Sequence, residues 1–185
     1  PTVPISRHMV FAGNPGTAKT TVARIIGQVY ADLGYVSNGQ LVEVGKADLQ
    51  GQWLGQTAPK VVDAFERARG GILFIDEAYM LNQVSSRDTY STEALGTIVK
   101  YMEDYRDEMI VIAAGYTDEM EKFLEQNPGL RSRFGHTLTF PDYTESELID
   151  IMKFFALKSG YVIDEKTKKK ITNYLSKLQT KPNFA

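Results

Sequence analysis

The stretch Gly13-Asn14-Pro15-Gly16-Thr17-Ala18-Lys19-Thr20-Thr21 joins an apolar run at residues 8–12 to a helical pattern that begins at Val22. Glycine at both bends lets such a loop turn its backbone N–H groups inward, and the following helix points its positive end at the same place. Backbone donors and a helix end that converge in this way bind phosphate. We therefore expect residues 13–21 to cradle the phosphate groups of a nucleotide.

Lys19 and Thr20 carry the side chains that a bound triphosphate requires. The ammonium group would lie near the β- and γ-phosphates as a point charge, and the hydroxyl group would ligate Mg²⁺. Ala18 departs from the pattern G-x-x-x-x-G-K-[ST], and its methyl group can be accommodated if the backbone there does not have positive φ. A Gly-Pro turn that merely precedes a lysine is the simpler alternative, but the order of strand, loop and helix favours a phosphate site.

Asp76 and Glu77 follow the apolar run at residues 72–75, which is typical of a strand buried on both faces. A phosphate site of this kind needs one carboxylate to reach the metal from a neighbouring strand and a second to prepare the attacking water. We expect Asp76 to hold Mg²⁺ through its water shell and Glu77 to orient or deprotonate the water. The alternative is that both acids only favour the N-terminus of a helix.

Apolar runs and helical patterns alternate along most of the chain. The predicted strands cover residues 8–12, 41–44, 72–75, 109–114 and 137–140. One predicted helix follows the phosphate loop and ends near residue 33, and the others cover residues 57–69, 92–103 and 117–126. This alternation predicts an α/β fold, a five-stranded parallel sheet sandwiched by helices. Ligands of such sheets bind beyond the carboxyl ends of the strands.

A boundary is predicted at residues 141–144, so that residues 1–141 form the α/β nucleotide-binding core and residues 142–185 a helical second domain. Thr144 and Glu147 have the spacing of a capping box, and the apolar positions that follow predict a helix. A second helix is expected from about Asp164. Two helices bury little apolar surface by themselves, so we expect this domain to be only part of a helical lid.

The composition excludes several classes of partner. The formal net charge of -2 provides no overall attraction to nucleic acid or to an anionic membrane, so we expect neither as a partner. The chain has no cysteine, which excludes disulfides and thiolate metal sites. Its longest apolar runs are too short to cross a bilayer, and its first residues lack a leader pattern. We expect a cytoplasmic protein.

Three motifs, at residues 13–21, 74–79 (Phe-Ile-Asp-Glu-Ala-Tyr) and 127–134 (Asn-Pro-Gly-Leu-Arg-Ser-Arg-Phe), together resemble those of the AAA+ ATPases. More narrowly, the chain resembles the branch that contains stage V sporulation protein K and the Rubisco activase CbbX, from about residue 8 to residue 177. The resemblance implies a P-loop ATPase that forms a homo-hexameric ring with ATP and Mg²⁺ between subunits. It makes Lys19 and Thr20 the Walker A pair, and Asp76 and Glu77 the Walker B pair.

The resemblance also places Arg131 and Arg133 where the family has its arginine finger, which neutralises charge at the γ-phosphate in the neighbouring subunit. We favour Arg131 for this role. The alternative is that one of the two arginines, above all Arg133, only pairs with a local acid such as Asp142. Tyr116 stands at or near the place of an asparagine that positions water in many members, although a phenol has a different reach. The second sensor arginine of the family lies on a later lid helix, which this sequence does not include.

The triplet Trp53-Leu54-Gly55 stands where threading AAA+ proteins carry a loop that faces the central pore. An exposed aromatic side chain can grip an extended polypeptide, and glycines at 51 and 55 let the loop move. The alternative is that Trp53 is a buried anchor beneath the loop.

These features predict an ATP-driven hexameric motor that remodels or threads a protein client through its pore. A nucleic-acid motor of the helicase or clamp-loader kind is one alternative, although the chain lacks a basic loop beside Trp53. A second alternative is a nucleotide-binding switch in which Ala18 and Tyr116 have slowed hydrolysis.

Overall fold

The computed structural model describes residues 6–51, 53, 55–82 and 89–179. By its internal contacts the chain divides into two units, Pro1–Phe140 and Pro141–Ala185. Each unit is described by itself.

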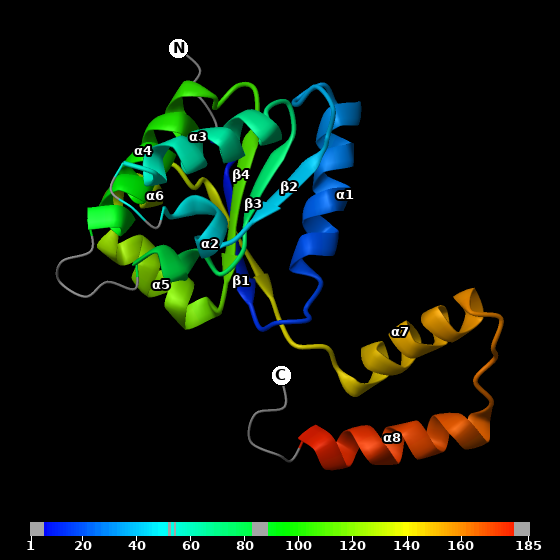
Figure 1. Ribbon diagram of the computed structural model, residues 1–185. Helices are drawn as coiled ribbons and strands as arrows, with labels where there is room; N and C mark the ends of the chain where they lie inside the picture. The colour runs from blue at the N-terminus through cyan, green and yellow to red at the C-terminus, as the bar shows by residue number, and fades with distance from the viewer. Residues whose placement is uncertain (1–5, 52, 54, 83–88, 180–185) are drawn as a thin grey trace. The chain divides into compact units, whose positions relative to one another are not determined.

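The first unit is built on a five-stranded parallel sheet with the order β2-β3-β4-β1-β5. Its strands are β1 (Met9–Gly13), β2 (Leu41–Val44), β3 (Ile72–Ile75), β4 (Ile110–Gly115) and β5 (His136–Phe140). The longer helices are α1 (Lys19–Asp32), α3 (Thr57–Ala68), α4 (Thr89–Asp104) and α5 (Thr117–Gln126). Helix α1 covers one face of the sheet, and α3, α4 and α5 cover the other (Figure 1). The predicted α/β fold, with helices on both faces, is confirmed.

Three short elements were not predicted: α2 (Lys46–Leu49), the 3-10 helix η1 (Ala78–Asn82) and α6 (Pro128–Arg131). Each contains only about one turn, and a single turn shows no periodic pattern of apolar residues. Two of them adjoin site residues, because η1 follows Glu77 and α6 ends at Arg131. The irregular parts of the site were therefore the parts that periodicity could not define.

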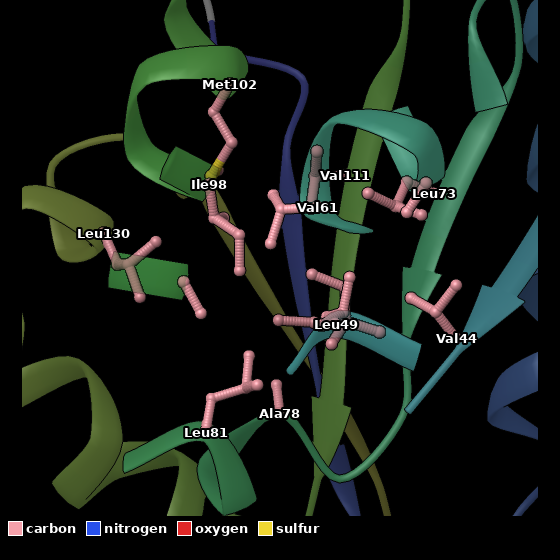
Figure 2. Close-up of a cluster of buried hydrophobic side chains, with 14 of the residues drawn as sticks. Val44, Leu49, Val61, Leu73, Ala78, Leu81, Ile98, Met102, Val111 and Leu130 are labelled. Atoms are coloured by element: carbon pink, nitrogen blue, oxygen red, sulfur yellow. The ribbon is translucent and has the colours of Figure 1, made fainter. Parts of the chain in front are cut away.

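The larger core lies between the sheet and helices α3 and α4, and Figure 2 shows Val61, Leu73, Ile98 and Val111 converging within it. All four side chains are at most 2% exposed. The continuous apolar runs of β3 and β4 match this position, because both strands have helices on each face. Burying one such side chain contributes about 1.5–3 kcal/mol.

Helix α1 packs on the sheet through only two of the four apolar positions of its pattern, Val22, Ile25, Ile26 and Val29. Ile25 and Val29 are 58% and 46% exposed, whereas Val22 and Ile26 pack against the second core. The contact side includes Gly27, where an added Cβ would lie 2.6 Å from the carbonyl oxygen of Gly39. Close approach of backbone to backbone therefore sets how α1 lies on the sheet.

The second unit consists of α7 (Glu145–Lys158) and α8 (Glu165–Gln179), which pack against each other. The predicted capping box is present, because the Thr144 hydroxyl accepts from the Glu147 N–H and the Glu147 carboxylate accepts from the Thr144 N–H. Phe155 and Leu157 stay 59% and 69% exposed. In the described part of the chain, no helix combines the length and the hydropathy that a membrane span requires.

The start of β1 depends on a buried histidine, His8, which is 3% exposed. Its Nδ1 accepts a hydrogen bond from the Val111 N–H at 3.0 Å, and its Nε2 lies 3.0 Å from the Met102 carbonyl oxygen. Both bonds are satisfied by a neutral ring with its proton on Nε2. The pKa of His8 is lowered, chiefly by burial, because a charged imidazolium loses its hydration there.

We expect His8 to make the stability of the protein depend on pH. Above its unfolded pKa of about 6.5 the ring is neutral in both states, and the stability is complete. Below that value the unfolded chain takes up a proton that the folded chain excludes, so the free energy of unfolding falls by up to about 1.4 kcal/mol per pH unit. The loss ends below the lowered folded pKa. Denaturant titrations between pH 5 and 8 measure this slope.

The variant His8→Gln should flatten this region of the pH profile, because an amide keeps a donor and an acceptor but cannot be protonated. His136→Gln, at the exposed start of β5, serves as the matched control and should keep the wild-type slope. An unchanged slope in His8→Gln would show that another group causes it.

Candidate functional site

The phosphate loop, the acid pair and Tyr116 lie at one edge of the sheet, where the carboxyl ends of β1, β3 and β4 meet. Ala12 pairs with Gly115, and Ile75 pairs with Ala113, so the three strands end at similar levels. The acid pair was expected on a strand neighbouring β1, which is wrong, because β4 lies between β3 and β1. The residue that follows β4, Tyr116, therefore stands between the phosphate loop and the acids.

The two glycines of the phosphate loop are required for different reasons, close packing at Gly13 and backbone conformation at Gly16. An added Cβ on Gly13 would lie 2.3 Å from the carbonyl oxygen of Phe140 in β5, so only glycine fits there. Gly16 has a φ of 78°, in the left-handed region. The Thr17 hydroxyl donates to the carbonyl oxygen of Asn14 at 2.8 Å, which braces the loop from within. Residues 13–17 are thus held in a tight turn directly ahead of α1.

Ala18 is the N-cap residue of α1 and has φ 65° and ψ 22°, which is the left-handed conformation. From the sequence we expected the methyl group of Ala18 to fit if φ is not positive, and this condition is not met. A non-glycine residue in this conformation costs about 1–2 kcal/mol, because Cβ approaches the following carbonyl oxygen. The loop is therefore strained at Ala18, where a glycine would take the same conformation without this cost.

Lys19 begins α1, and its side chain folds back into the loop. Its ammonium group donates to the carbonyl oxygens of Gly13 at 2.8 Å and Asn14 at 2.7 Å. Burial lowers the pKa of Lys19, and the negative charge of Asp76 opposes this shift. The structure thus brings the lysine of the loop and the first acid of the pair within electrostatic reach of each other.

Asp76 and Glu77 are oriented by an unusual turn at the end of β3. Glu77 has a φ of 47°, and its N–H donates to Oδ1 of Asp76 at 3.0 Å. Its carbonyl oxygen accepts from the Met80 N–H at 2.8 Å, which starts η1. Asp76 is half-buried while the Glu77 side chain is exposed. The two neighbouring acids therefore face different surroundings, as two different roles would require.

Tyr79 is a site residue that the sequence reasoning did not single out. Its hydroxyl donates to Oε1 of Glu77 at 3.4 Å, and its ring lies 6.0 Å from the ring of Tyr116. Burial, followed by the charge of Glu77, raises the pKa of Tyr79 to about 12, so the phenol keeps its proton. The ring fills the space beside Gly115, where an added Cβ would lie 2.7 Å away. Its place in the quoted Asp-Glu-Ala-Tyr motif was the available signal.

Tyr116 and Tyr79 form one wall of an open cavity of about 480 Å³ beside the phosphate loop. Its lining residues are Asn14, Tyr79, Tyr116, Thr117, Asp118 and Glu119. Tyr116 caps α5 and is 38% exposed. A water molecule or other small polar group in this cavity would therefore lie near the hydroxyl groups of Tyr79 and Tyr116.

The side chains suited to Mg²⁺ are the Thr20 hydroxyl, on the first turn of α1, and the Asp76 carboxylate. No cluster of three or more metal-ligating side chains occurs among the residues that the structure describes. A magnesium ion bound with a nucleotide needs no such cluster, because phosphate oxygens and waters complete its octahedron. The donor set therefore fits an ion that arrives with the triphosphate.

A family model matches residues 9–142, which cover the whole sheet and the site edge: "ATPase family associated with various cellular activities (AAA)". The chain belongs to the AAA family. The AAA domain of FIGL-1, solved in complex with ADP, has the same fold, with a TM-score of 0.58 at 24% identity over 83% of this chain and 49% of that chain.

Several curated proteins are similar to this AAA chain over nearly its whole length. Protein CfxQ of Xanthobacter flavus is 46% identical over 96% of this chain and 56% of its own length. Stage V sporulation protein K of Bacillus subtilis is 46% identical over 91% of this chain and 52% of its own length. Protein CbbX of Cereibacter sphaeroides is 43% identical over 96% of this chain and 58% of its own length. The chain thus spans little more than half the length of these relatives. The predicted branch of the AAA family is confirmed.

Two arginines lie near α6 within the AAA core, and the structure distinguishes them. Arg131 is exposed, and within the described residues its guanidinium has no ion pair or side-chain hydrogen bond. Arg133 donates from Nη1 to the carbonyl oxygen of Gly129 at 3.0 Å and lies 3.6 Å from Oε2 of Glu103. From the sequence we gave Asp142 as an example of an acid that could pair with one of these arginines. In the structure, the acid that pairs with Arg133 is Glu103.

The Trp53 side chain is 70% exposed, so the alternative of a buried anchor is wrong. Gly55 has a φ of 80°, and the Gln56 N–H donates to the carbonyl oxygen of Trp53 at 3.2 Å, which closes a turn. Leu54, the second residue predicted for this loop, lies outside the described residues.

The substitution Ala18→Gly should stabilise the AAA core. Glycine adopts positive φ without the Cβ clash, which we expect to raise the free energy of unfolding by about 1 kcal/mol. Ala23→Gly, in the same helix at ordinary helical geometry, should lower it by about 1 kcal/mol or more. Denaturant titration of the two variants should give opposite signs. A loss of stability in both would mean that Ala18 is not strained.

Proposed function

We propose that this chain is the nucleotide-hydrolysing core of an ATP-driven motor, a ring of six copies that remodels a protein client in its central pore. The observation that carries the proposal is the convergence of Lys19, Asp76 and Glu77 at one edge of the sheet, with the charge of Asp76 acting on Lys19. Membership of the AAA family supports ATP as the nucleotide. The chain spans little more than half the length of its relatives, and the proposal concerns the motor core alone.

In the proposed reaction a water oxygen bonds to the γ-phosphorus of ATP while the bond to the β–γ bridging oxygen breaks. The exposed Glu77 carboxylate accepts the proton of that water. Lys19 provides positive charge where negative charge develops on the phosphate oxygens. Mg²⁺, held by Thr20 and by Asp76 through its water shell, would supply further charge neutralisation. The products are ADP and inorganic phosphate.

Arg131 supports the ring. Its exposed guanidinium, which has no ion pair among the described residues, is available to a neighbouring copy, where it can neutralise charge on the γ-phosphate. A monomer would leave this side chain without a role in the reaction. The site is therefore proposed to be complete only between two copies.

A protein client is favoured over nucleic acid by the surroundings of Trp53. Lys60, the first lysine after the loop, donates its ammonium protons to the carbonyl oxygens of Ala47 and Gln50 at 3.1 and 2.9 Å. That ammonium group is therefore bound to backbone carbonyls rather than presented freely beside Trp53. The exposed indole can contact the side chains of an extended polypeptide without needing a particular sequence.

The variant Glu77→Gln should bind ATP with wild-type affinity but hydrolyse it about 100-fold or more slowly, because the amide cannot accept the proton. Equilibrium binding of labelled ATP and steady-state phosphate release from the native assembly measure the two properties. Glu66→Gln, an exposed acid on α3 that is hydrogen-bonded to Tyr105, is the matched control and should be unaffected.

The same comparison tests the switch alternative. If the wild-type protein binds ATP but turns it over no faster than Glu77→Gln, ATP binding alone does the signalling and the motor proposal is wrong.

The variant Trp53→Ala should abolish the rise in ATP turnover that a permanently unfolded polypeptide elicits, because the gripping side chain is gone. Trp53→Phe should keep most of that rise, since it keeps an exposed aromatic ring. The measured quantity is the ratio of turnover with and without the polypeptide.

The same variants, titrated with single-stranded DNA at increasing salt concentration, test the nucleic-acid alternative. Tight, salt-sensitive binding that depends on Trp53 would replace the protein client by nucleic acid.

A further inference from the structure

The phenol ring of Tyr79 is held in one place at the end of β4. A Cβ added at Gly115 would lie 2.7 Å from Cδ1 and 2.9 Å from Cε1 of this ring, so the ring rests directly on the backbone of β4. Gly115 does not have positive φ, and its glycine therefore serves this contact rather than a turn. The ring also packs against the larger core. The missing side chain at residue 115 thus makes room for Tyr79.

From this fixed ring, the hydroxyl of Tyr79 reaches Glu77. It donates to Oε1 of Glu77 at 3.4 Å. Among the residues that the structure describes, no other side chain donates to this carboxylate. A glutamate side chain is long and flexible, so an exposed carboxylate samples many positions unless a partner restrains it. Tyr79 is therefore the restraint that the structure provides for Glu77.

The hydrogen bond from Tyr79 leaves part of the Glu77 carboxylate available. An ionised carboxylate accepts through both of its oxygens, and the phenol occupies Oε1, so Oε2 remains for another proton. Burial, and after it the charge of Glu77, raises the pKa of Tyr79 to about 12, so the phenol stays a donor near neutral pH. The bond thus restrains the carboxylate without taking up its capacity to accept a proton.

We propose that Tyr79 is a positioning residue, whose hydroxyl holds Oε1 of Glu77 and leaves Oε2 to accept the proton of the attacking water. This inference rests on the proposed ATPase reaction, in which Glu77 is the base. A general base contributes about 100- to 10,000-fold to a rate, and only within hydrogen-bond reach of the proton that it takes. Tyr79 acts through Glu77 and needs no contact with the nucleotide.

The variant Tyr79→Phe removes the hydroxyl and keeps the ring on Gly115. It should lower kcat about 10-fold in the native assembly, because the base is no longer held in place. KM and the equilibrium binding of ATP should stay unchanged, because the phosphate loop is intact. Tyr105→Phe, which removes a phenol bond to the carboxylate of Glu66 at 2.7 Å, is the matched control and should keep the wild-type kcat. An unchanged or higher kcat in Tyr79→Phe would overturn the proposal.

Double variants separate positioning from a general structural defect. In the Glu77→Gln background, Tyr79→Phe should cause no further loss of kcat, because the carboxylate through which it acts is already gone. A further loss, or weakened ATP binding, would show a structural role instead. Gly115→Ala should displace the ring and lower kcat by itself, and Tyr79→Phe should then add little. Gly96→Ala, whose added Cβ meets nothing within 4 Å, is the control for that change.

The hydrogen bond can also be observed without nucleotide, by NMR of tyrosine labelled at Cζ at neutral pH. The resonance of Tyr79 is the one that Tyr79→Phe removes, and it should move in Glu77→Gln but not in Glu66→Gln. The resonance of Tyr105 should respond in the opposite way. A Tyr79 resonance that does not respond to Glu77→Gln would contradict the contact on which the proposal depends.

The outcomes distinguish this inference from the proposed function. If Glu77→Gln hydrolyses ATP as fast as the wild-type protein, the proposed base fails, and the positioning role fails with it. If Glu77→Gln is slow but Tyr79→Phe is as fast as the wild type, the positioning role alone is overturned. Slow turnover in both variants, with no further loss in the double variant, supports both.

Discussion

The site depends on the parallel register of β3, β4 and β1. Because all three strands point the same way and end at similar levels, three connections leave the sheet at one edge. One is the phosphate loop, one carries Asp76 and Glu77, and one begins with Tyr116. Backbone hydrogen bonds between buried strands hold this edge rigidly, which allows irregular loops to carry the residues of the proposed site.

Two non-glycine residues at this edge have positive φ, Ala18 and Glu77. Both stand where the chain leaves a strand or enters a helix beside the proposed phosphate position. Such conformations cost free energy and persist only when the surrounding structure compensates for them. The buried faces of the sheet and of α1 provide that compensation, so the stable part of the fold supports strained turns in the part that we propose reacts.

The partly buried charges of the site follow the same logic. Lys19 is removed from water and bound to two loop carbonyls, while Asp76 limits the loss of its affinity for protons. Tyr79 and Tyr116 add an apolar wall with hydroxyl groups, so the space beside the loop is neither fully aqueous nor fully apolar. Charges interact more strongly in such surroundings than in bulk water.

The sequence by itself determined the strands and longer helices, and it predicted the residues that we propose carry the chemistry. Apolar runs and helical spacing located the strands and the longer helices within a few residues, and the spacing of Gly13, Gly16 and Lys19 predicted a phosphate loop ahead of α1. The acids after β3 and the capping box at Thr144 also follow from local spacing, because each is an interaction within a few residues. Exposure of Trp53 was expected from its glycine-flanked loop.

Only the tertiary structure decided which distant groups meet. That β4 separates the acids from the phosphate loop, that Ala18 is left-handed, and that Tyr79 contacts Glu77 depend on how strands and turns pack. The division between an exposed Arg131 and a tethered Arg133 depends on Glu103 and Ser6, the latter 127 residues away in the sequence. Local spacing cannot determine such partners. Residues far apart in the sequence meet only because the whole core packs in one way, and that packing does not depend on the two residues alone.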